Sequence, residues 1–272
     1  MRSRWSWAAI LGWALPLLVT TPGLAQAQNT GHEFSLTTAG SGLTLHKEMF
    51  LQPGTYASRY SGTQTEIVFQ LSGKYQLLNS RLYLGYTQVS YWQAYDLKNS
   101  SPFRETNYNP ELFYHFAEKP WSVGRLGLKT GLEHQSNGQS MPLSRSWNLL
   151  YAAPYFQGKN WLAYVKIRYR IPESAKETPD SGEGDDNPDI TDFLGWSDVH
   201  LTYHLPNRSQ LHLLMRGYIG IDKGLISLKW SVPLMHFENT WLLISGSSGY
   251  GESLADYNRS VNRVGIGVMF NR

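Results

Sequence analysis

The chain has 272 residues, no cysteine, 17% charged and 14% aromatic residues, and a formal net charge of +3. This length suits one sizeable domain, and the lack of cysteine excludes both a disulfide framework and a lipid-anchored N-terminal cysteine. Because Arg2 and Arg4 belong to the extreme N-terminus, the rest of the chain is nearly neutral, which does not indicate a nucleic-acid partner. No apolar window of about 18 residues occurs after the N-terminus, which excludes a transmembrane helix.

The N-terminal segment has the pattern of a secretory signal peptide. Arg2 and Arg4 precede an apolar run at residues 7–19, and Ala25 and Ala27 form a small-residue cleavage pattern. Such a run is too short to span a bilayer. We therefore expect residues 1–27 to be removed on export and residues 28–272 to form one domain, the alternative being a buried N-terminal helix.

After residue 60 apolar and polar residues alternate with a period of two, which indicates β-strands. In residues 161–170 the apolar positions share one face and the cations share the other. The apolar set is Trp161, Ala163, Val165, Ile167 and Tyr169, and the polar set is Lys166, Arg168 and Arg170. About eleven such runs of about ten residues follow residue 60, and one more is expected near residues 43–51. Residues 173–191 are polar and predict a long surface loop.

Two all-β architectures fit this pattern. A soluble sandwich or lipocalin-like barrel would bury the apolar faces, whereas a transmembrane barrel would turn them toward lipid and keep the charges in its lumen. Strand length, aromatic residues near strand ends and the export signal favour the second. We therefore predict a 12-stranded antiparallel transmembrane β-barrel of the outer-membrane type, in which closure leaves no free edge. Such chains commonly end in phenylalanine, whereas here Asn271 and Arg272 follow Phe270.

A polar pair interrupts the apolar face of the strand that enters the sequence GLEHQSNGQSMPLSRSWN, residues 131–148. Alternation places His134 and Ser136 on the lipid-facing side together with Leu132, and it places Glu133 and Gln135 in the lumen. The barrel itself does not require a polar pair at that place. One interpretation is a pair of interfacial residues at the base of a loop, and the other is a catalytic pair.

The strand that returns from this loop can place Asn148 beside His134. Ser136, His134 and Asn148 would then supply a nucleophile, a general base and a group that orients the base. Gly138 follows closely and can offer a backbone N–H to an oxyanion. No G-x-S-x-G sequence occurs, so the pattern is not that of an α/β-hydrolase.

Four segments, one of them containing these residues, resemble the Gram-negative outer membrane phospholipase A family. They are HQSNGQSMPLSRSWN (134–148), SSPFRETNYNPELF (100–113), DDNPDIT (185–191) and SGYGESLADYN (248–258). The resemblance runs from about residue 64 to the end of the chain. It implies a 12-stranded barrel in the cell outer membrane that hydrolyses acyl esters of phospholipids and lysophospholipids, uses calcium and is active as a homodimer.

The resemblance also assigns roles to particular residues. It makes Ser136 the nucleophile, His134 the base and Asn148 the orienting residue. It implies a catalytic Ca²⁺ held by three groups. These are the backbone carbonyl of Gln139, the side chain of Ser144 and a serine of the partner subunit, which matches Ser100, with Ser101 as the neighbouring candidate. A second calcium site of the family would use Asp186 and a carboxylate where this chain has Met141, so we expect one functional calcium class per active site.

Gln88 falls on the lipid-facing side of the strand expected at residues 82–92, near its middle. An unpaired amide in hydrocarbon costs several kcal/mol, so we expect a second copy of the chain to pair with Gln88, the alternative being a position close enough to the boundary to reach water. Two other functions remain open. One is a catalytically silent porin or structural barrel, and the other is a soluble ligand-binding barrel. If the chain is the enzyme, its expected partners are phospholipids, lysophospholipids and outer-membrane lipids.

Overall fold

The computed structural model describes residues 42–78, 80–178, 181–217, 223–235 and 237–272. They belong to one compact unit, His32–Arg272. The signal peptide expected at residues 1–27 lies outside the described residues, as do residues 28–41. No helix in the described ranges is long and apolar enough to cross a membrane.

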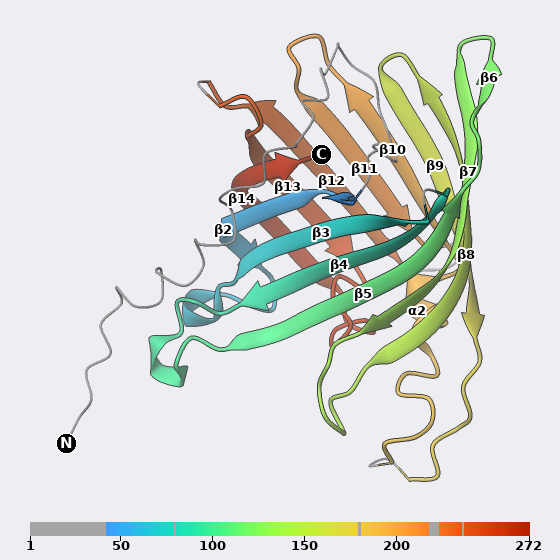
Figure 1. Cartoon of the computed structure of the whole chain (residues 1–272). Helices are drawn as coiled ribbons and strands as arrows, with labels where there is room; N and C mark the ends of the chain where they lie inside the picture. Colours follow the sequence, from blue (N-terminus) through green and yellow to red (C-terminus); the bar gives the residue numbers. More distant parts are fainter. Residues whose placement is uncertain (1–41, 79, 179–180, 218–222, 236) are drawn as a thin grey trace. The chain divides into compact units, whose positions relative to one another are not determined.

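Twelve antiparallel strands form a closed barrel (Figure 1). They are β2 (Met49–Ala57), β3 (Ile67–Leu77), β4 (Leu82–Trp92), β5 (Phe103–His115), β7 (Gly124–Ser136), β8 (Ser146–Gly158), β9 (Trp161–Ile171), β10 (Ser197–His204), β11 (Gln210–Arg216), β12 (Leu225–Pro233), β13 (Trp241–Gly249) and β14 (Val261–Asn271). Neighbours in this order are paired, and pairing of β14 with β2 closes the sheet. Closure gives the backbone groups of the first and last strands partners within the protein, as hydrocarbon requires. The predicted fold class is confirmed.

In the described residues, five short elements lie outside the barrel wall or at its ends. They are β1 (Leu43–Leu45), η2 (Gly62–Gln64), η3 (Leu97–Asn99), β6 (Lys119–Trp121) and α2 (Ile190–Leu194). β1 pairs with β3, and β6 extends the β5–β7 hairpin by pairing with β7. The bounds of the strand expected near residues 43–51 were wrong, because that stretch is divided between β1 and β2.

The residues between β1 and β2 place charged side chains in the lumen, which explains the interruption. His46 Nε2 lies 2.7 Å from a carboxylate oxygen of Glu111, and Lys47 Nζ lies 2.8 Å from the same oxygen. Glu48 accepts a hydrogen bond from His212 Nδ1 at 2.7 Å. A strand that continued through this stretch would turn at least one of these ionic groups toward lipid.

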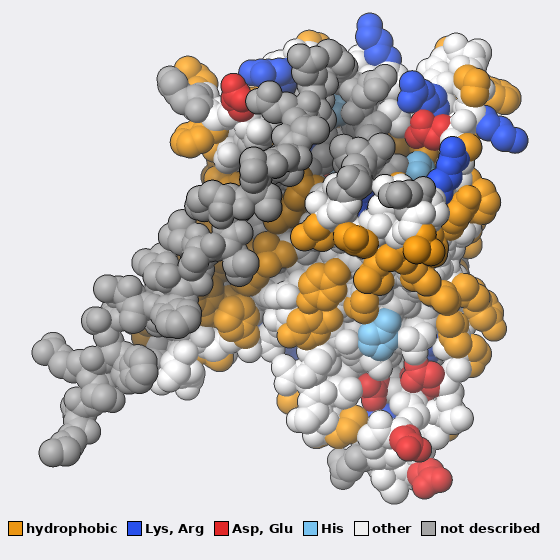
Figure 2. All heavy atoms as spheres, viewed as in Figure 1, with side chains coloured by type: hydrophobic (Ala, Val, Ile, Leu, Met, Phe, Trp, Pro, Cys, Tyr) orange, Lys and Arg blue, Asp and Glu red, His pale blue; other side chains and the backbone are white. Residues whose placement is uncertain are grey.

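The outer face of the barrel is apolar, as the alternation predicts. On β9, Ile167 and Tyr169 are exposed while Arg168 between them is only 4% exposed. The same division holds on β12 and β14, where the exposed set is Ile226, Leu228, Trp230, Val264, Ile266 and Phe270. Figure 2 shows the apolar side chains as a band across the barrel, with charged side chains toward its two ends. An exposed apolar band of this kind suits a bilayer and argues against the soluble barrel.

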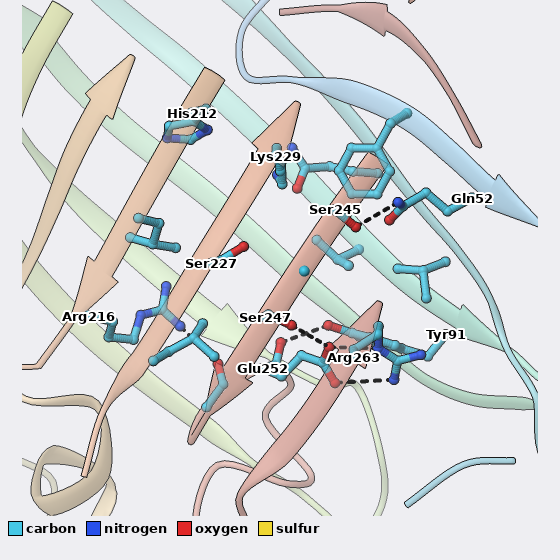
Figure 3. A pocket seen from close by; sticks show the side chains of 18 residues that line it. Gln52, Tyr91, His212, Arg216, Ser227, Lys229, Ser245, Ser247, Glu252 and Arg263 are labelled. Atoms are coloured by element: carbon cyan, nitrogen blue, oxygen red, sulfur yellow. Dashed lines mark hydrogen bonds and ion pairs between the residues drawn. The ribbon is translucent and has the colours of Figure 1, made fainter. Parts of the chain in front are cut away.

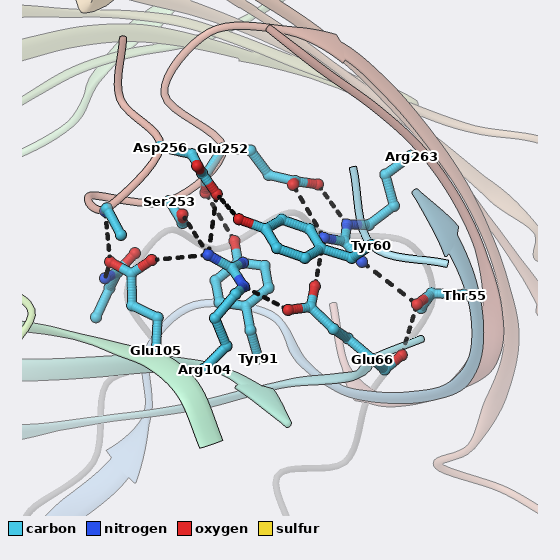
Figure 4. A network of polar contacts seen from close by, with 12 residues as sticks. Thr55, Tyr60, Glu66, Tyr91, Arg104, Glu105, Glu252, Ser253, Asp256 and Arg263 are labelled. Atoms are coloured by element: carbon cyan, nitrogen blue, oxygen red, sulfur yellow. Dashed lines mark hydrogen bonds and ion pairs between the residues drawn. The ribbon is translucent and has the colours of Figure 1, made fainter. Parts of the chain in front are cut away.

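Ion pairs fill the lumen near the end that carries the long loops (Figure 4). The guanidinium of Arg263 lies 2.6 Å from Glu66 and 2.6 Å from Glu252. Arg104 contacts Glu66 as well, and its Nη1 lies 3.0 Å from Asp256. Glu66 is fully buried, so the two arginines provide the charge compensation that a buried carboxylate needs.

The lumen also contains small cavities with both polar and apolar lining. One of about 220 Å³ is lined by Gln52, Arg216, Lys229, Glu252 and Arg263 among others (Figure 3). A neighbouring cavity of about 230 Å³ reaches Glu133 and Lys166 on β7 and β9. Cavities of this size suit clusters of water molecules, whereas wide solute channels belong to barrels with more strands.

We expect Arg263→Ala to destabilise the barrel strongly, because it leaves Glu66 and Glu252 without a shared cation in a buried site. Removing one partner of a buried ion pair costs about 3–5 kcal/mol. The free energy of unfolding in urea, followed by tryptophan fluorescence in detergent micelles, measures this loss.

Arg259→Ala is the matched control, because the Arg259 side chain is 57% exposed and its one ion pair, to Asp256, is 3.6 Å long. We expect a change within about 1 kcal/mol for this exposed pair. Equal losses in the two variants would contradict a stabilising role for the buried network.

Candidate active site

The β7–β8 hairpin brings His134 and Asn148 together on the outer face of the barrel. The two residues are direct partners in the register of the strands. His134 Nδ1 lies 2.8 Å from Asn148 Oδ1, and since an amide oxygen can only accept, Nδ1 carries the hydrogen. Leu132 and Leu150, which share this face, are each 47% exposed, whereas Glu133 is buried in the lumen. The pairing that the sequence analysis expected is therefore present.

Ser136 is the last residue of β7 and points to the same side as His134. It pairs with Ser146 on β8 and with Tyr108 on β5. Among the described residues no hydrogen bond involves the Ser136 hydroxyl, and none engages His134 Nε2. With the hydrogen on Nδ1, Nε2 carries the lone pair that a general base uses. The arrangement can activate a hydroxyl once the Ser136 side chain turns toward that nitrogen.

Asn137 holds the loop that follows Ser136 and was missed by the sequence analysis. Its side chain is 3% exposed, donates to the Leu143 carbonyl at 2.9 Å and accepts from the Arg145 N–H at 2.9 Å. The next residue, Gly138, has a φ of +63°, and a Cβ there would lie 2.8 Å from the Tyr108 ring. Both the positive φ and the lack of room for a Cβ therefore require glycine at this position. The Asn-Gly pair in the sequence indicates a turn. It does not indicate that the Asn137 amide is buried.

The lumen-facing side of the same hairpin packs on the short helix α2. Trp147 and Leu149 are fully buried against Ile190 and Leu194. Trp147 Nε1 also donates to Gln135 Oε1 at 2.9 Å across the hairpin. Burial of large apolar side chains is worth roughly 1.5–3 kcal/mol each. This cluster fixes the strands whose opposite faces carry His134 and Asn148.

Two of the predicted calcium ligands are in direct contact. Ser144 Oγ donates to Asp186 Oδ2 at 2.5 Å, and Ser146 Oγ donates to the same oxygen at 3.2 Å. Partial burial raises the pKa of the Asp186 carboxyl, but hydrogen bonds from Lys176 and Ser144 outweigh it and hold the pKa below its ordinary value. Asp186 is therefore an anion beside the Ser144 hydroxyl.

The Gln139 carbonyl lies in the same loop and has no hydrogen-bond partner among the described residues. Carbonyl, hydroxyl and carboxylate oxygens are the ligands that Ca²⁺ prefers. The Gln139 carbonyl and the Ser144 hydroxyl are therefore oxygen ligands of the kind that a calcium ion takes.

A second calcium ion does not fit the residues at Asp186. Lys176 Nζ lies 2.6 Å from Asp186 Oδ1 and 3.0 Å from Met141 Sδ, and it donates to the Ser181 carbonyl at 2.9 Å. The ammonium group thus already neutralises the carboxylate, and a thioether is a poor ligand for a hard cation. Lys176 was not singled out by the sequence analysis, because its place depends on the fold of the 172–189 connection.

Ser100 and Ser101 lie in the β4–β5 connection, where both have positive φ values of 63° and 52°. The structure distinguishes them. Ser101 Oγ donates to the Ala94 carbonyl at 3.0 Å, whereas the Ser100 side chain is exposed and makes no hydrogen bond within the described chain. Within the part of the chain that the structure describes, no contact brings Ser100 to the loop of Ser144. Ser100 is the one of the two whose hydroxyl is available to a partner.

Gln88 faces outward on β4, with Leu71 and Tyr108 as its partners on the two flanking strands. Its amide makes two hydrogen bonds within the chain, which corrects the expectation that the amide would be unpaired in a single copy. Tyr86 donates to Gln88 Oε1 at 3.0 Å, and Gln88 Nε2 donates to Ser90 Oγ at 3.1 Å. One N–H and one lone pair of the amide remain for another molecule.

Asn148 has a second partner that the sequence analysis missed. Its Nδ2 donates to Glu173 Oε1 at 2.8 Å, just beyond the end of β9. The candidate site therefore draws on three elements: β7 supplies His134 and Ser136, β8 supplies Asn148, and the β9–β10 connection supplies Glu173.

Comparisons with known proteins agree with this geometry. The phospholipase A1 of Salmonella typhimurium is 40% identical over 229 residues, covering 80% of this chain and 73% of that protein. The phospholipase A1 of Escherichia coli K12 is 40% identical over 219 residues, covering 76% and 70%.

Solved structures are similar over most of the chain. The outer membrane phospholipase of Salmonella typhi, a dimer with bound calcium, has a TM-score of 0.72 at 36% identity and covers 84% of this chain and 92% of that one. Outer membrane phospholipase A of Escherichia coli has a TM-score of 0.72 at 35% identity, covering 84% and 98%. The family model described as phospholipase A1 matches residues 34–270, beginning earlier than the motifs that first indicated it, and the chain therefore belongs to the phospholipase A1 family.

Proposed function

We propose that this chain is a calcium-dependent serine hydrolase of the outer membrane that cleaves acyl esters of phospholipids and lysophospholipids. The contact between His134 Nδ1 and Asn148 Oδ1, two residues from Ser136 on a lipid-facing surface, is the observation that carries the proposal. Membership of a phospholipase family and the outward apolar band support it. A related Escherichia coli structure is described as an active-site mutant in which an asparagine is replaced by alanine, which supports a role for Asn148.

In the proposed reaction the Ser136 oxygen attacks the ester carbonyl while its proton passes to His134 Nε2. Asn148 holds the Nδ1–H, so the imidazole presents its basic nitrogen to Ser136. The Gly138 N–H donates to the oxyanion of the tetrahedral intermediate. Collapse of that intermediate breaks the ester C–O bond, and His134 gives the proton to the departing alcohol. Water, deprotonated by His134, then attacks the acyl-Ser136 ester. The bond between the acyl carbon and the Ser136 oxygen breaks, His134 returns the proton to that oxygen, and the fatty acid is released.

Gln139 and Ser144 would hold the calcium ion, together with Ser100 from a partner subunit. When bound, the ion supplies positive charge that favours negative charge on the ester oxygen. Asp186 accepts a hydrogen bond from Ser144 and so fixes the direction of that hydroxyl oxygen. Because Lys176 offsets the charge of Asp186, the affinity for calcium should be modest.

A homodimer would place Ser100 of each subunit at the other subunit's site. The proposal rests on the exposed Ser100 hydroxyl and on Gln88 on the outward face of β4, whose amide is held between Tyr86 and the buried Ser90. The remaining N–H of one Gln88 can donate to the remaining lone pair of the other across a two-fold axis. The Salmonella typhi relative is described as a dimer with bound calcium, which supports this assembly.

The alternative function, a silent porin or structural barrel, has less support. Ion pairs of Glu66, Arg104 and Arg263 occupy the lumen, and the cavities beside them are small. A passive pore also gives no reason for a His–Asn pair on the lipid-facing side.

We expect Ser136→Ala to lose nearly all esterase activity, by about a thousandfold or more, because the nucleophile is removed. Hydrolysis of a phospholipid in mixed micelles with calcium measures the loss, and a sulfonyl fluoride should label Ser136 in the unmodified protein. Asn148→Ala should lose less, because it orients the base and does not react. Heat-modifiable migration on gels checks that each barrel is folded. Substantial activity in Ser136→Ala would remove this residue as the nucleophile.

Calcium should be needed for hydrolysis and not for folding, because its proposed ligands lie in loops outside the barrel wall. A chelator should stop hydrolysis reversibly and leave the gel migration unchanged. Ser144→Ala should raise the calcium concentration for half-maximal activity several-fold. Ser140→Ala is the control, because Ser140 lies in the same loop and its exposed hydroxyl has no partner among the described residues. Full activity in excess chelator would end the calcium proposal.

Gln88→Ala should weaken dimerisation by about 0.6–2 kcal/mol, the range for hydrogen bonds between membrane segments, and activity should fall in step. Chemical crosslinking and hydrolysis, measured on the same detergent samples, test this. Leu201→Ala, on the outward face of β10, removes an exposed side chain away from β4 and should change neither. A fully active monomer, or a dimer indifferent to Gln88, would show that β4 is not the interface.

A further inference from the structure

The Asn148 amide is held from both sides. Its oxygen faces His134 Nδ1 at 2.8 Å, and its nitrogen donates to Glu173 Oε1 at 2.8 Å. The three side chains form a chain from imidazole through amide to carboxylate. Asn148 and Glu173 are both half-buried, so the contact is partly shielded from water.

The segment that carries Glu173 is fixed by several contacts. Arg170 Nη2 forms a 2.5 Å ion pair with Asp185. The Asp185 N–H donates to the Ser174 carbonyl at 2.8 Å, directly after Glu173. Asn187 in turn accepts from the Ser146 N–H at 3.0 Å, which ties the connection to β8. Glu173 therefore meets Asn148 on a segment whose backbone is anchored on both sides.

We propose that Glu173 is a positioning residue of the catalytic site, acting through Asn148. Its carboxylate fixes the orientation of the Asn148 amide and supplies the negative charge that a neutral asparagine lacks. The inference rests on the proposed function, since it assumes that His134 is the base that activates Ser136.

The orientation of the amide decides which nitrogen of His134 is basic. An amide can turn by 180° and exchange its oxygen and nitrogen at little steric cost. A turned Asn148 would offer N–H to His134 Nδ1, which would then have to accept and would move the ring hydrogen to Nε2. The imidazole would lose the lone pair that takes the Ser136 proton. Glu173 prevents this, because a carboxylate only accepts hydrogen bonds and would repel the amide oxygen.

The charge of Glu173 also favours the protonated imidazole that forms during the reaction. Around the His134–Asn148 pair, β5 contributes the neutral Tyr108 and Asn109, and β8 contributes the neutral Ser146. β9 contributes the apolar Ile171 beside Asn148.

The charged groups nearby on these strands are each paired elsewhere: Glu133 forms an ion pair with Lys166 on the lumen side, and Arg170 forms one with Asp185. Among the described residues, Glu173 is therefore the ionic side chain in direct contact with the pair.

The test compares Glu173→Gln and Glu173→Ala with the unmodified protein, with full calcium and a soluble ester. Glutamine keeps the size but can present either oxygen or N–H to Asn148, so both the fixed orientation and the charge are lost. We expect kcat to fall about five- to tenfold for Gln and further for Ala, with KM within about twofold, as a charged hydrogen bond is replaced by a neutral one. The acid-side midpoint of the pH profile should move to lower pH.

Two controls separate a positioning role of Glu173 from a general effect of removing a negative charge. Glu177→Gln makes the same charge change in the same connection, at an exposed side chain without a partner in the described chain, and should leave kcat and the profile unchanged. In an Asn148→Ala background, Glu173→Gln should have less than about a twofold effect, because contacting residues are not additive.

A readout that needs no hydrolysis distinguishes this inference from the proposed function. In Ser136→Ala protein with labelled histidine, the Nδ1–H proton of His134 should give a downfield resonance, which Glu173→Ala shifts or removes. Absence of ester hydrolysis in the unmodified protein would overturn the proposed function. An unmoved resonance, an unmoved pH profile or an equal kcat loss in the Asn148→Ala background would overturn the role of Glu173.

Discussion

Closure of the sheet between β14 and β2 is the constraint on which the rest of the structure depends. A closed sheet has two faces that meet different solvents, and strand alternation assigns each residue to one of them. Charges on the lumen side must neutralise one another, as Glu66 and Arg263 do. Polar groups on the lipid side need a separate reason. For His134 and Asn148, the proposed catalytic chemistry is that reason.

Much of this arrangement could be predicted from the sequence because it follows from a period of two. The outward faces of β9, β12 and β14 and the pairing of His134 with Asn148 depend only on alternation and on a short connection between two strands. The divided strand at residues 43–57 could not be predicted in this way. There, contacts of Lys47 and Glu48 with distant strands outweigh the local pattern.

The residues that the sequence analysis missed all act through connections. Asn137 meets its partners within the β7–β8 loop, and Glu173 and Lys176 meet theirs through the connection after β9. No periodicity fixes these contacts. Some of these partners are far along the chain: Asn148 is 25 positions from Glu173, and Met141 is 35 positions from Lys176. Ser144 and Asp186 could both be named from the sequence, whereas their direct contact and the ammonium group of Lys176 beside it depend on the fold of the connection after β9.

The outward position of His134 and Ser136 has a consequence for how substrate reaches the protein. A lipid that diffuses in the plane of the bilayer arrives at the wall of the barrel sideways and need not leave the membrane or enter the lumen. Such a catalyst is surrounded by its substrate at a density set by the membrane itself, so scarcity of substrate cannot restrain it. Control must then act on whether the lipids beside the wall are of the right kind and whether the site is complete.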